Sequence, residues 1–196
     1  MRIRNKMGGI KSKPELPQED LDFLKAHTCY DEDTIREWYE GFKQDCASGR
    51  LTPDKFVDMY KMLSPSGNVE QFCEHVFRAF DTDKDGHVDF KEFLLAIDVC
   101  SNGTAEEKLK WAHRVYDVDG DGVINREEMT KIVQSVYDMQ GSDATRTMDS
   151  AREKAEDIFS RMDENGDGHV TEDEFVSGCL QDEEISKMLT PNTKMI

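Results

Sequence analysis

Apolar residues recur at helical spacing on both sides of three short acidic stretches in this chain. The segments before these stretches carry Phe72, Val76 and Phe80; Leu109, Ala112 and Tyr116; and Ile158, Phe159 and Met162. The segments after them begin with Phe93 and Leu94, with Met129, and with Phe175 and Val176. This spacing keeps an apolar stripe on one face of a helix. The pattern predicts three helix–loop–helix units, which should pair because one unit cannot bury its stripe alone.

The acidic stretches follow one common pattern. They read DTDKDGHVDFKE from Asp81, DVDGDGVINREE from Asp117 and DENGDGHVTEDE from Asp163. Each satisfies D-x-[DN]-x-[DN]-G-x5-E, the calcium loop of an EF-hand. One match can arise by chance in an acidic loop. Three complete copies, with 36 residues from 81 to 117 and 46 from 117 to 163, make chance negligible.

The spacing suits calcium because a hard cation that takes about six to eight oxygens needs a short loop curled around it. Alternate positions supply the oxygens, the seventh through its backbone carbonyl and the ninth through water, and a glycine permits the sharp turn. We therefore interpret His87 and His169 as calcium ligands through their backbone carbonyl oxygens, not as zinc ligands. We expect dissociation constants of about 10⁻⁷ to 10⁻⁵ M for all three sites. The predicted ligands are Asp81, Asp83, Asp85, His87, Asp89 and Glu92; Asp117, Asp119, Asp121, Val123, Asn125 and Glu128; and Asp163, Asn165, Asp167, His169, Thr171 and Glu174.

Three hands leave one without a mate, and a degenerate copy lies about 36 residues before Asp81. The segment QDCASGRLTPDK, from Gln44, keeps Gly49 at the turn and Leu51 where the other loops carry an aliphatic residue. Its last position is Lys55, which puts a cation where the loop needs a carboxylate that offers two oxygens. This first hand is predicted to bind no calcium.

The overall composition narrows the function classes. A formal net charge of -17 and a pI near 4.6 argue against nucleic-acid binding, because phosphate backbones attract basic surfaces. No signal-peptide core and no apolar run long enough for a bilayer is visible, so we expect a cytoplasmic protein, peripheral to membrane if it is acylated. The five cysteines are odd in number and lack a CxxC pair, which favours free, buried thiols.

Four segments extend the argument beyond the loops: IREWYEGFKQDCASG, EHVFRAFDTDKDG, GTAEEKLKWAHRVYDVDGDG and MGGIKS. With them, the chain from Met7 onward resembles the neuronal calcium sensor family, which includes recoverin, hippocalcin, neurocalcin and visinin-like proteins. It departs from that family in the six residues before Met7 and in Ala47, where proline is usual. The resemblance implies a cytosolic sensor with an N-myristoyl group on Gly8. Acylation needs a free α-amine, so it requires a start at Met7.

The resemblance also implies an output surface. Calcium would open an apolar groove in the N-terminal half for an amphipathic helix of a target protein of the kinase, cyclase or channel class. The alternative for each groove residue is plain core. An acylated chain would add a membrane surface as partner. The N-terminal segment carries five basic residues, Arg2, Arg4, Lys6, Lys11 and Lys13, of which only Lys11 and Lys13 remain after a start at Met7. The groove residues are Trp38, Phe42, Phe56, Met59, Tyr60, Leu63, Phe90 and Ile97.

The sequence thus predicts an all-α fold of four EF-hands in two pairs, with short β-strands between paired loops. We divide it into a tail with the start of the first helix (1–25), an N-terminal pair (26–100), a C-terminal pair (101–182) and a C-terminal tail (183–196). Pro17 marks a helix start, 140–149 a linker and 182–189 a last short helix that could cover part of the groove. A calcium buffer and a constitutive regulatory subunit of a cyclase or channel remain alternatives. An enzyme is not expected, because calcium explains every carboxylate cluster.

Overall fold

The computed structural model describes residues 15–63, 68–139 and 147–189. Gly8 and the basic N-terminal residues lie outside this part of the chain, as does most of the predicted linker at 140–149. The elements, in order, are α1 (Gln18–His27), α2 (Glu32–Asp45), α3 (Pro53–Leu63), α4 (Glu70–Phe80), α5 (Phe90–Asn102), α6 (Ala105–Tyr116), β1 (Val123–Ile124), α7 (Arg126–Met139), α8 (Met148–Met162), β2 (Val170–Thr171), α9 (Glu172–Gln181) and α10 (Glu183–Leu189).

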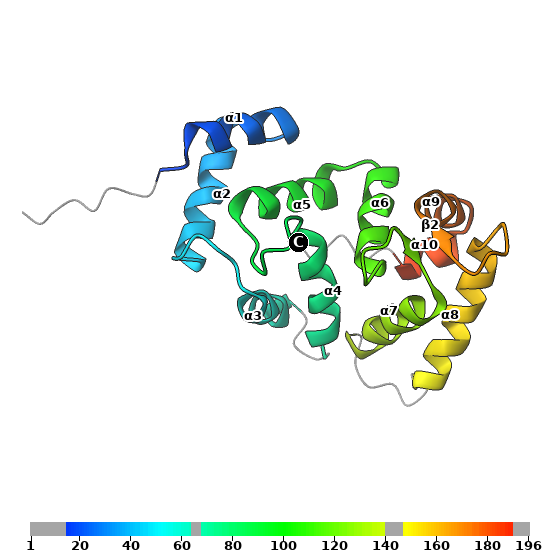
Figure 1. Cartoon of the computed structure of the whole chain (residues 1–196). Coiled ribbons are helices and arrows are strands. Elements are labelled where there is room, and N and C mark those ends of the chain that lie inside the picture. Colours follow the sequence, from blue (N-terminus) through cyan, green and yellow to red (C-terminus); the bar gives the residue numbers. More distant parts are fainter. Residues whose placement is uncertain (1–14, 64–67, 140–146, 190–196) are drawn as a thin grey trace, which may run out of the picture.

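The helices form four helix–loop–helix units, α2 with α3, α4 with α5, α6 with α7 and α8 with α9 (Figure 1). The loops of the last two units pair through β1 and β2, which are antiparallel and join Val123 to Thr171 and Ile124 to Val170. The loops of the first two units pair through a single bridge between Leu51 and Val88. The predicted all-α fold of two EF-hand pairs with short strands is confirmed.

Acidic and hydroxyl side chains fix where the exiting and entering helices begin. Asp89 caps α5 and Thr171 caps α9, each accepting a hydrogen bond from the amide three residues on. The glutamate at that third position accepts a hydrogen bond from the amide of the cap residue, which completes a capping box. Thr104 caps α6 in the same way. Positions nine and twelve of two loops therefore start the helix that follows them.

Aromatic side chains fill the core of the N-terminal half and extend into the other half. Phe80, at the end of α4, packs edge-on against Phe56 of α3 at 5.6 Å between ring centroids and against Trp111 of α6 at 5.8 Å. Arg78 of α4 donates a hydrogen bond to the carbonyl oxygen of Val115 in α6, and the amide of Asn68 bonds to the carbonyl of Asp138 in α7. These contacts join the two EF-hand pairs along α4.

Both ends of the described chain match the predicted helices. Pro17 precedes the first residue of α1, and Glu19 and Asp20 lie in its first turn. The predicted last helix is α10, which packs on α9 in the C-terminal half. Its Leu189 is buried, and the carbonyl oxygen of this residue accepts a hydrogen bond from the Tyr116 hydroxyl at 2.8 Å.

All five cysteines are free thiols, as predicted, and four of them are buried. The expectation of burial is wrong for Cys29, which is exposed between α1 and α2 and donates to the carboxylate of Asp98 at 3.0 Å. Cys46, which could have linked two chains had it been exposed, is buried. Within the described ranges, no helix is long and apolar enough to span a bilayer.

Candidate metal centres

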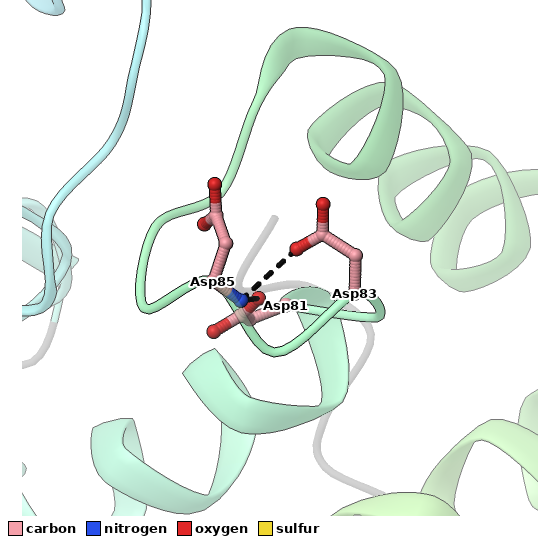
Figure 2. Close-up of side chains that lie close together, drawn as sticks. All are labelled: Asp81, Asp83 and Asp85. Atoms are coloured by element: carbon pink, nitrogen blue, oxygen red, sulfur yellow. Dashed lines mark hydrogen bonds between the residues drawn. The ribbon is translucent and has the colours of Figure 1, made fainter.

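Loop 81–92 follows α4 directly and gathers three carboxylates. Asp81, Asp83 and Asp85 each place a carboxylate oxygen within 4.8 Å of the others. Figure 2 shows the three side chains projecting from one short turn of the chain. Loop amides hold them there, because the Gly86 amide donates to Asp81 at 2.9 Å and the Asp85 amide donates to Asp83 at 3.0 Å. Hydrogen bonds within the loop therefore hold these carboxylates close together.

A left-handed residue makes this tight turn in every loop. Gly86 has a φ of +83°, Gly122 of +94° and Gly168 of +87°. A side chain in this region costs roughly 1 to 2 kcal/mol, which explains glycine at the sixth position. Gly49, with a φ of +79°, keeps the same turn in loop 44–55, although that loop has no acid at its first, third, fifth or twelfth position.

The last glutamate closes loop 81–92. One oxygen of Glu92 accepts the Thr82 amide at 2.9 Å near the start of the loop, and the other accepts the Asp89 amide at 3.0 Å near its end. This carboxylate spans the loop and has both oxygens turned toward residues beside the acidic cluster. That is where a ligand contributing two oxygens is required.

Loop 117–128 repeats this arrangement with more burial. Asp117, Asp119 and Glu128 place oxygens within 4.8 Å of one another. Glu128 accepts the Val118 amide at 2.8 Å and the Asn125 amide at 2.9 Å. Asp117 is 8% exposed and Glu128 only 4%. Buried carboxylates need pairing or a metal, so this donor set of oxygens fits a hard cation.

Loop 163–174 shares the turn but not the closure. Asp163 accepts the amides of Gly166 and Gly168 at 2.8 and 3.0 Å. Glu174, however, accepts both the amide and the hydroxyl of Thr171 at 2.9 and 2.8 Å, and makes no contact with the start of the loop among the described residues. Both of these bonds end on Oε2 of Glu174, whereas Glu92 uses Oε2 for the Asp89 amide and Oε1 for the start of its loop. The sequence pattern did not reveal this difference.

The loop histidines are not members of the carboxylate clusters, although Nδ1 of His87 lies 3.7 Å from Oδ1 of Asp85. The groups of potential ligand atoms found in the described part of the chain contain aspartate and glutamate, and neither His87 nor His169 belongs to them. The His87 ring is instead 3.3 Å from the carbonyl oxygen of Asp85. The assignment of the seventh position as a backbone ligand stays a prediction.

A pocket of about 530 Å³ lies beside loop 81–92 in the N-terminal half, and we call it the Trp38 pocket. It is lined by Glu37, Trp38, Gly41, Phe42, Asp45, Cys46, Leu51, Met59 and Phe93. Trp38 is 37% exposed and its ring centroid lies 6.1 Å from that of Phe93. The pocket is therefore an apolar hollow with two acids, Glu37 and Asp45, in its lining.

The predicted groove residues fall into two groups. Trp38, Phe42 and Met59 line the Trp38 pocket, whereas Phe56, Tyr60, Phe90 and Ile97 are buried in the core and do not line it. Leu63 ends α3, and its side chain lies outside the described part. Sequence reasoning missed Leu51 and Phe93 as lining residues. Both had a signal, since Phe93 directly follows the last predicted ligand and Leu51 stands where the complete loops carry an aliphatic residue.

Comparisons with known proteins agree with this geometry. The family model described as an EF-hand domain pair matches residues 106–190, and a second model of the same description matches residues 47–96. The fold and the acidic loops thus define a calcium-binding EF-hand protein. The chain is also similar to Neuronal calcium sensor 1 of Lymnaea stagnalis, with 42% identity over 182 residues, which covers 92% of this chain and 95% of that protein. It belongs to the neuronal calcium sensor family and is a calcium sensor.

Proposed function

We propose that the chain binds three calcium ions and uses the Trp38 pocket to hold an amphipathic helix of a target protein. One observation carries the link between these two parts. Phe93 lines the pocket and directly follows Glu92, the last predicted ligand of loop 81–92. A shift of the Glu92 backbone would therefore move a wall of the pocket.

The proposed ligands are those assigned from the sequence in loops 81–92, 117–128 and 163–174. Calcium supplies a hard divalent charge, and these loops offer it oxygen donors alone. The acidic clusters around Asp81 and Asp117 support the first two sites. The third rests on the loop pattern and on the Asp163 turn. Loop 44–55 has Lys55 in the closing position and is proposed to bind none. This division corresponds to an N-terminal pair at 26–100 and a C-terminal pair at 101–182.

The lining of the Trp38 pocket indicates the chemistry of its partner. Its aromatic and aliphatic side chains suit the apolar face of a helix, and Glu37 and Asp45 suit basic residues beside that face. Such segments occur in targets of the kinase, cyclase or channel class, which is the class we propose.

Calcium-dependent retention on a phenyl resin tests this output. We expect the full chain to bind in calcium and to elute in chelator, and the variant Trp38→Ala/Met59→Ala to lose most of that retention. The control is Met148→Ala, which removes an exposed methionine from α8, away from the Trp38 pocket. Retention that is equal in calcium and chelator, or unchanged in the double variant, would contradict the proposal. A calcium-buffering protein would show no retention in either condition. A constitutive regulatory subunit would copurify with its partner in chelator.

We propose a second, membrane-directed output from the segment MGGIKS. With translation from Met7, Gly8 would carry a myristoyl group, which alone gives marginal membrane affinity of roughly 10⁴ M⁻¹. Lys11 and Lys13 would add basic charge. The intact mass of the protein from its own cells tests this: an acylated chain beginning at Gly8 supports it, and a chain beginning at Met1 or Arg2 rejects it. Liposome pelleting of the acylated chain, equal in calcium and chelator, would rule out a calcium-driven switch.

A further inference from the structure

The disabled loop reaches into its neighbour through one side chain. Arg50 of loop 44–55 places Nη1 3.1 Å from Oδ2 of Asp85 in loop 81–92. The backbone holds Arg50 at this border, because the next residue, Leu51, exchanges hydrogen bonds of 2.8 and 2.9 Å with Val88. The Ser48 hydroxyl also bonds to the Arg50 carbonyl at 3.1 Å. The ion pair therefore joins the disabled loop, which has no acid at its first, third, fifth or twelfth position, to an acid of the adjacent loop.

The corresponding acids of the other two calcium loops have no such ion pair among the described residues. Asp85, Asp121 and Asp167 occupy the fifth position of their loops, and each accepts the amide two residues on through Oδ1, at 2.9, 3.0 and 2.9 Å. The second oxygen, Oδ2, is the one left for a ligand contact. Within the described residues it meets Arg50 at Asp85, whereas at Asp121 and Asp167 it meets no cation. Loop 81–92 thus differs from the other two at a predicted ligand atom.

We propose that Arg50 competes with calcium for Asp85 and sets a lower affinity for loop 81–92 than its acids alone would give. This inference rests on the proposed role of Asp85 as a ligand. The guanidinium must release or share Oδ2 when the oxygen turns to the ion, and its positive charge opposes a second cation nearby. The disabled first hand would then keep a regulatory task, which is to supply this cation.

The size of the effect follows from exposure. The side chain of Arg50 is 57% exposed and that of Asp85 39%. Ion pairs between such exposed side chains contribute little free energy. The corresponding change in the calcium dissociation constant is about two- to fivefold. Because both groups face solvent, the effect should also shrink with salt.

The test uses the full chain with Glu128→Gln and Glu174→Gln, which leaves loop 81–92 as the binding loop, and measures the calcium dissociation constant by titration calorimetry. In this parent we expect Arg50→Gln to lower the constant about two- to fivefold at low salt, with the difference narrowing as KCl is raised. The matched control is Arg36→Gln, which removes an arginine paired with Glu32 at 2.9 Å on α2 and should change nothing.

Each other outcome has a defined meaning. An unchanged constant in Arg50→Gln overturns the inference and leaves the proposed calcium site intact. An equal change in Arg36→Gln assigns the effect to overall charge and also overturns it. A parent that binds no calcium rejects the ligand assignment of loop 81–92, and the inference with it.

Discussion

The Arg78 guanidinium donates a hydrogen bond to the carbonyl oxygen of Val115 at 2.9 Å. Arg78 lies in the last turn of α4, which leads into Asp81, and Val115 lies in the last turn of α6, which leads into Asp117. Carbonyls in the last turn of a helix lack a partner within it, and here a side chain from the other EF-hand pair supplies one. The two pairs are therefore joined beside two of the candidate calcium loops.

Replacing Arg78 with methionine should destabilise the protein by about 1 to 3 kcal/mol, because a charged donor is lost from a half-buried carbonyl. Urea unfolding in chelator measures this loss. Arg36→Met is the control, since its exposed pair on α2 should contribute less than about 1 kcal/mol. Equal unfolding free energies for the two variants would show that the contact with Val115 adds nothing.

Phe80 is the aromatic centre of the contact between the two halves and is 1% exposed. Its truncation in Phe80→Ala should cost about 3 to 5 kcal/mol, because the contacts with Phe56 and Trp111 are lost and a cavity remains. Met62→Ala, at a side chain that is 74% exposed, should cost less than about 0.5 kcal/mol. The same urea experiment compares them, and a loss below about 1 kcal/mol for Phe80→Ala would refute the packing described.

Burial lowers the pKa of His75 from 6.5 to about 4, and the neighbouring Arg78 adds to this effect. In the unfolded chain the pKa returns to about 6.5, so between these values the unfolded state binds more protons. The contribution to stability is complete above pH 6.5 and is lost as the pH falls toward 4. Because the side chain is partly exposed, solvent screens this contribution, and from pH 7 to 5 we expect a loss on the order of 1 kcal/mol.

His75→Gln removes this contribution to stability and leaves the other titratable groups in place. Urea unfolding at pH 7 and pH 5, in calcium-free buffer, should show a smaller loss of stability in this variant than in the parent. Identical losses in both proteins would mean that His75 does not titrate as described.

Cys29 is the exposed thiol and should react first with a thiol reagent in the native protein. Its hydrogen bond to Asp98 raises its pKa, so the rate should be below that of an ordinary exposed cysteine at neutral pH. Burial raises the pKa of Cys73 to about 12 and that of Cys100 to about 11, which protects them further. Ellman titration should give one fast thiol that disappears in Cys29→Ser; a fast phase that persists in this variant would contradict the assignment.

The calcium loops could be predicted from the sequence because their geometry is local. Each loop places acids, a glycine and a closing glutamate within one short segment, and hydrogen bonds such as Gly86 to Asp81 join near neighbours. The helix starting after Pro17 followed from equally local signals. The repeated loop pattern predicted the fold class, the pairing of the hands, the three complete loops and the one disabled loop.

Contacts between distant segments could not be predicted in this way. Phe93 lines the Trp38 pocket, whereas Phe90 does not. This difference depends on the angle between α2 and α5, which the spacing of residues in the sequence does not reveal. The pair of Arg50 with Asp85 joins two loops, and the exposure of Cys29 depends on how α1 meets α5. The contacts of Glu174 are local, yet the loop pattern does not say that its hydrogen bonds to Thr171 both end on one oxygen, Oε2.

The number of calcium ions bound per chain tests the central claim most directly. Titration calorimetry of the full chain should give three ions, and two after Glu92→Gln, Glu128→Gln or Glu174→Gln. Each variant replaces a charged carboxylate that offers two oxygens with a neutral amide that offers one. Lys55→Gln, in the disabled loop, should leave the count at three. A parent that binds fewer than three ions, or a closing-glutamate variant that still binds three, would contradict the account.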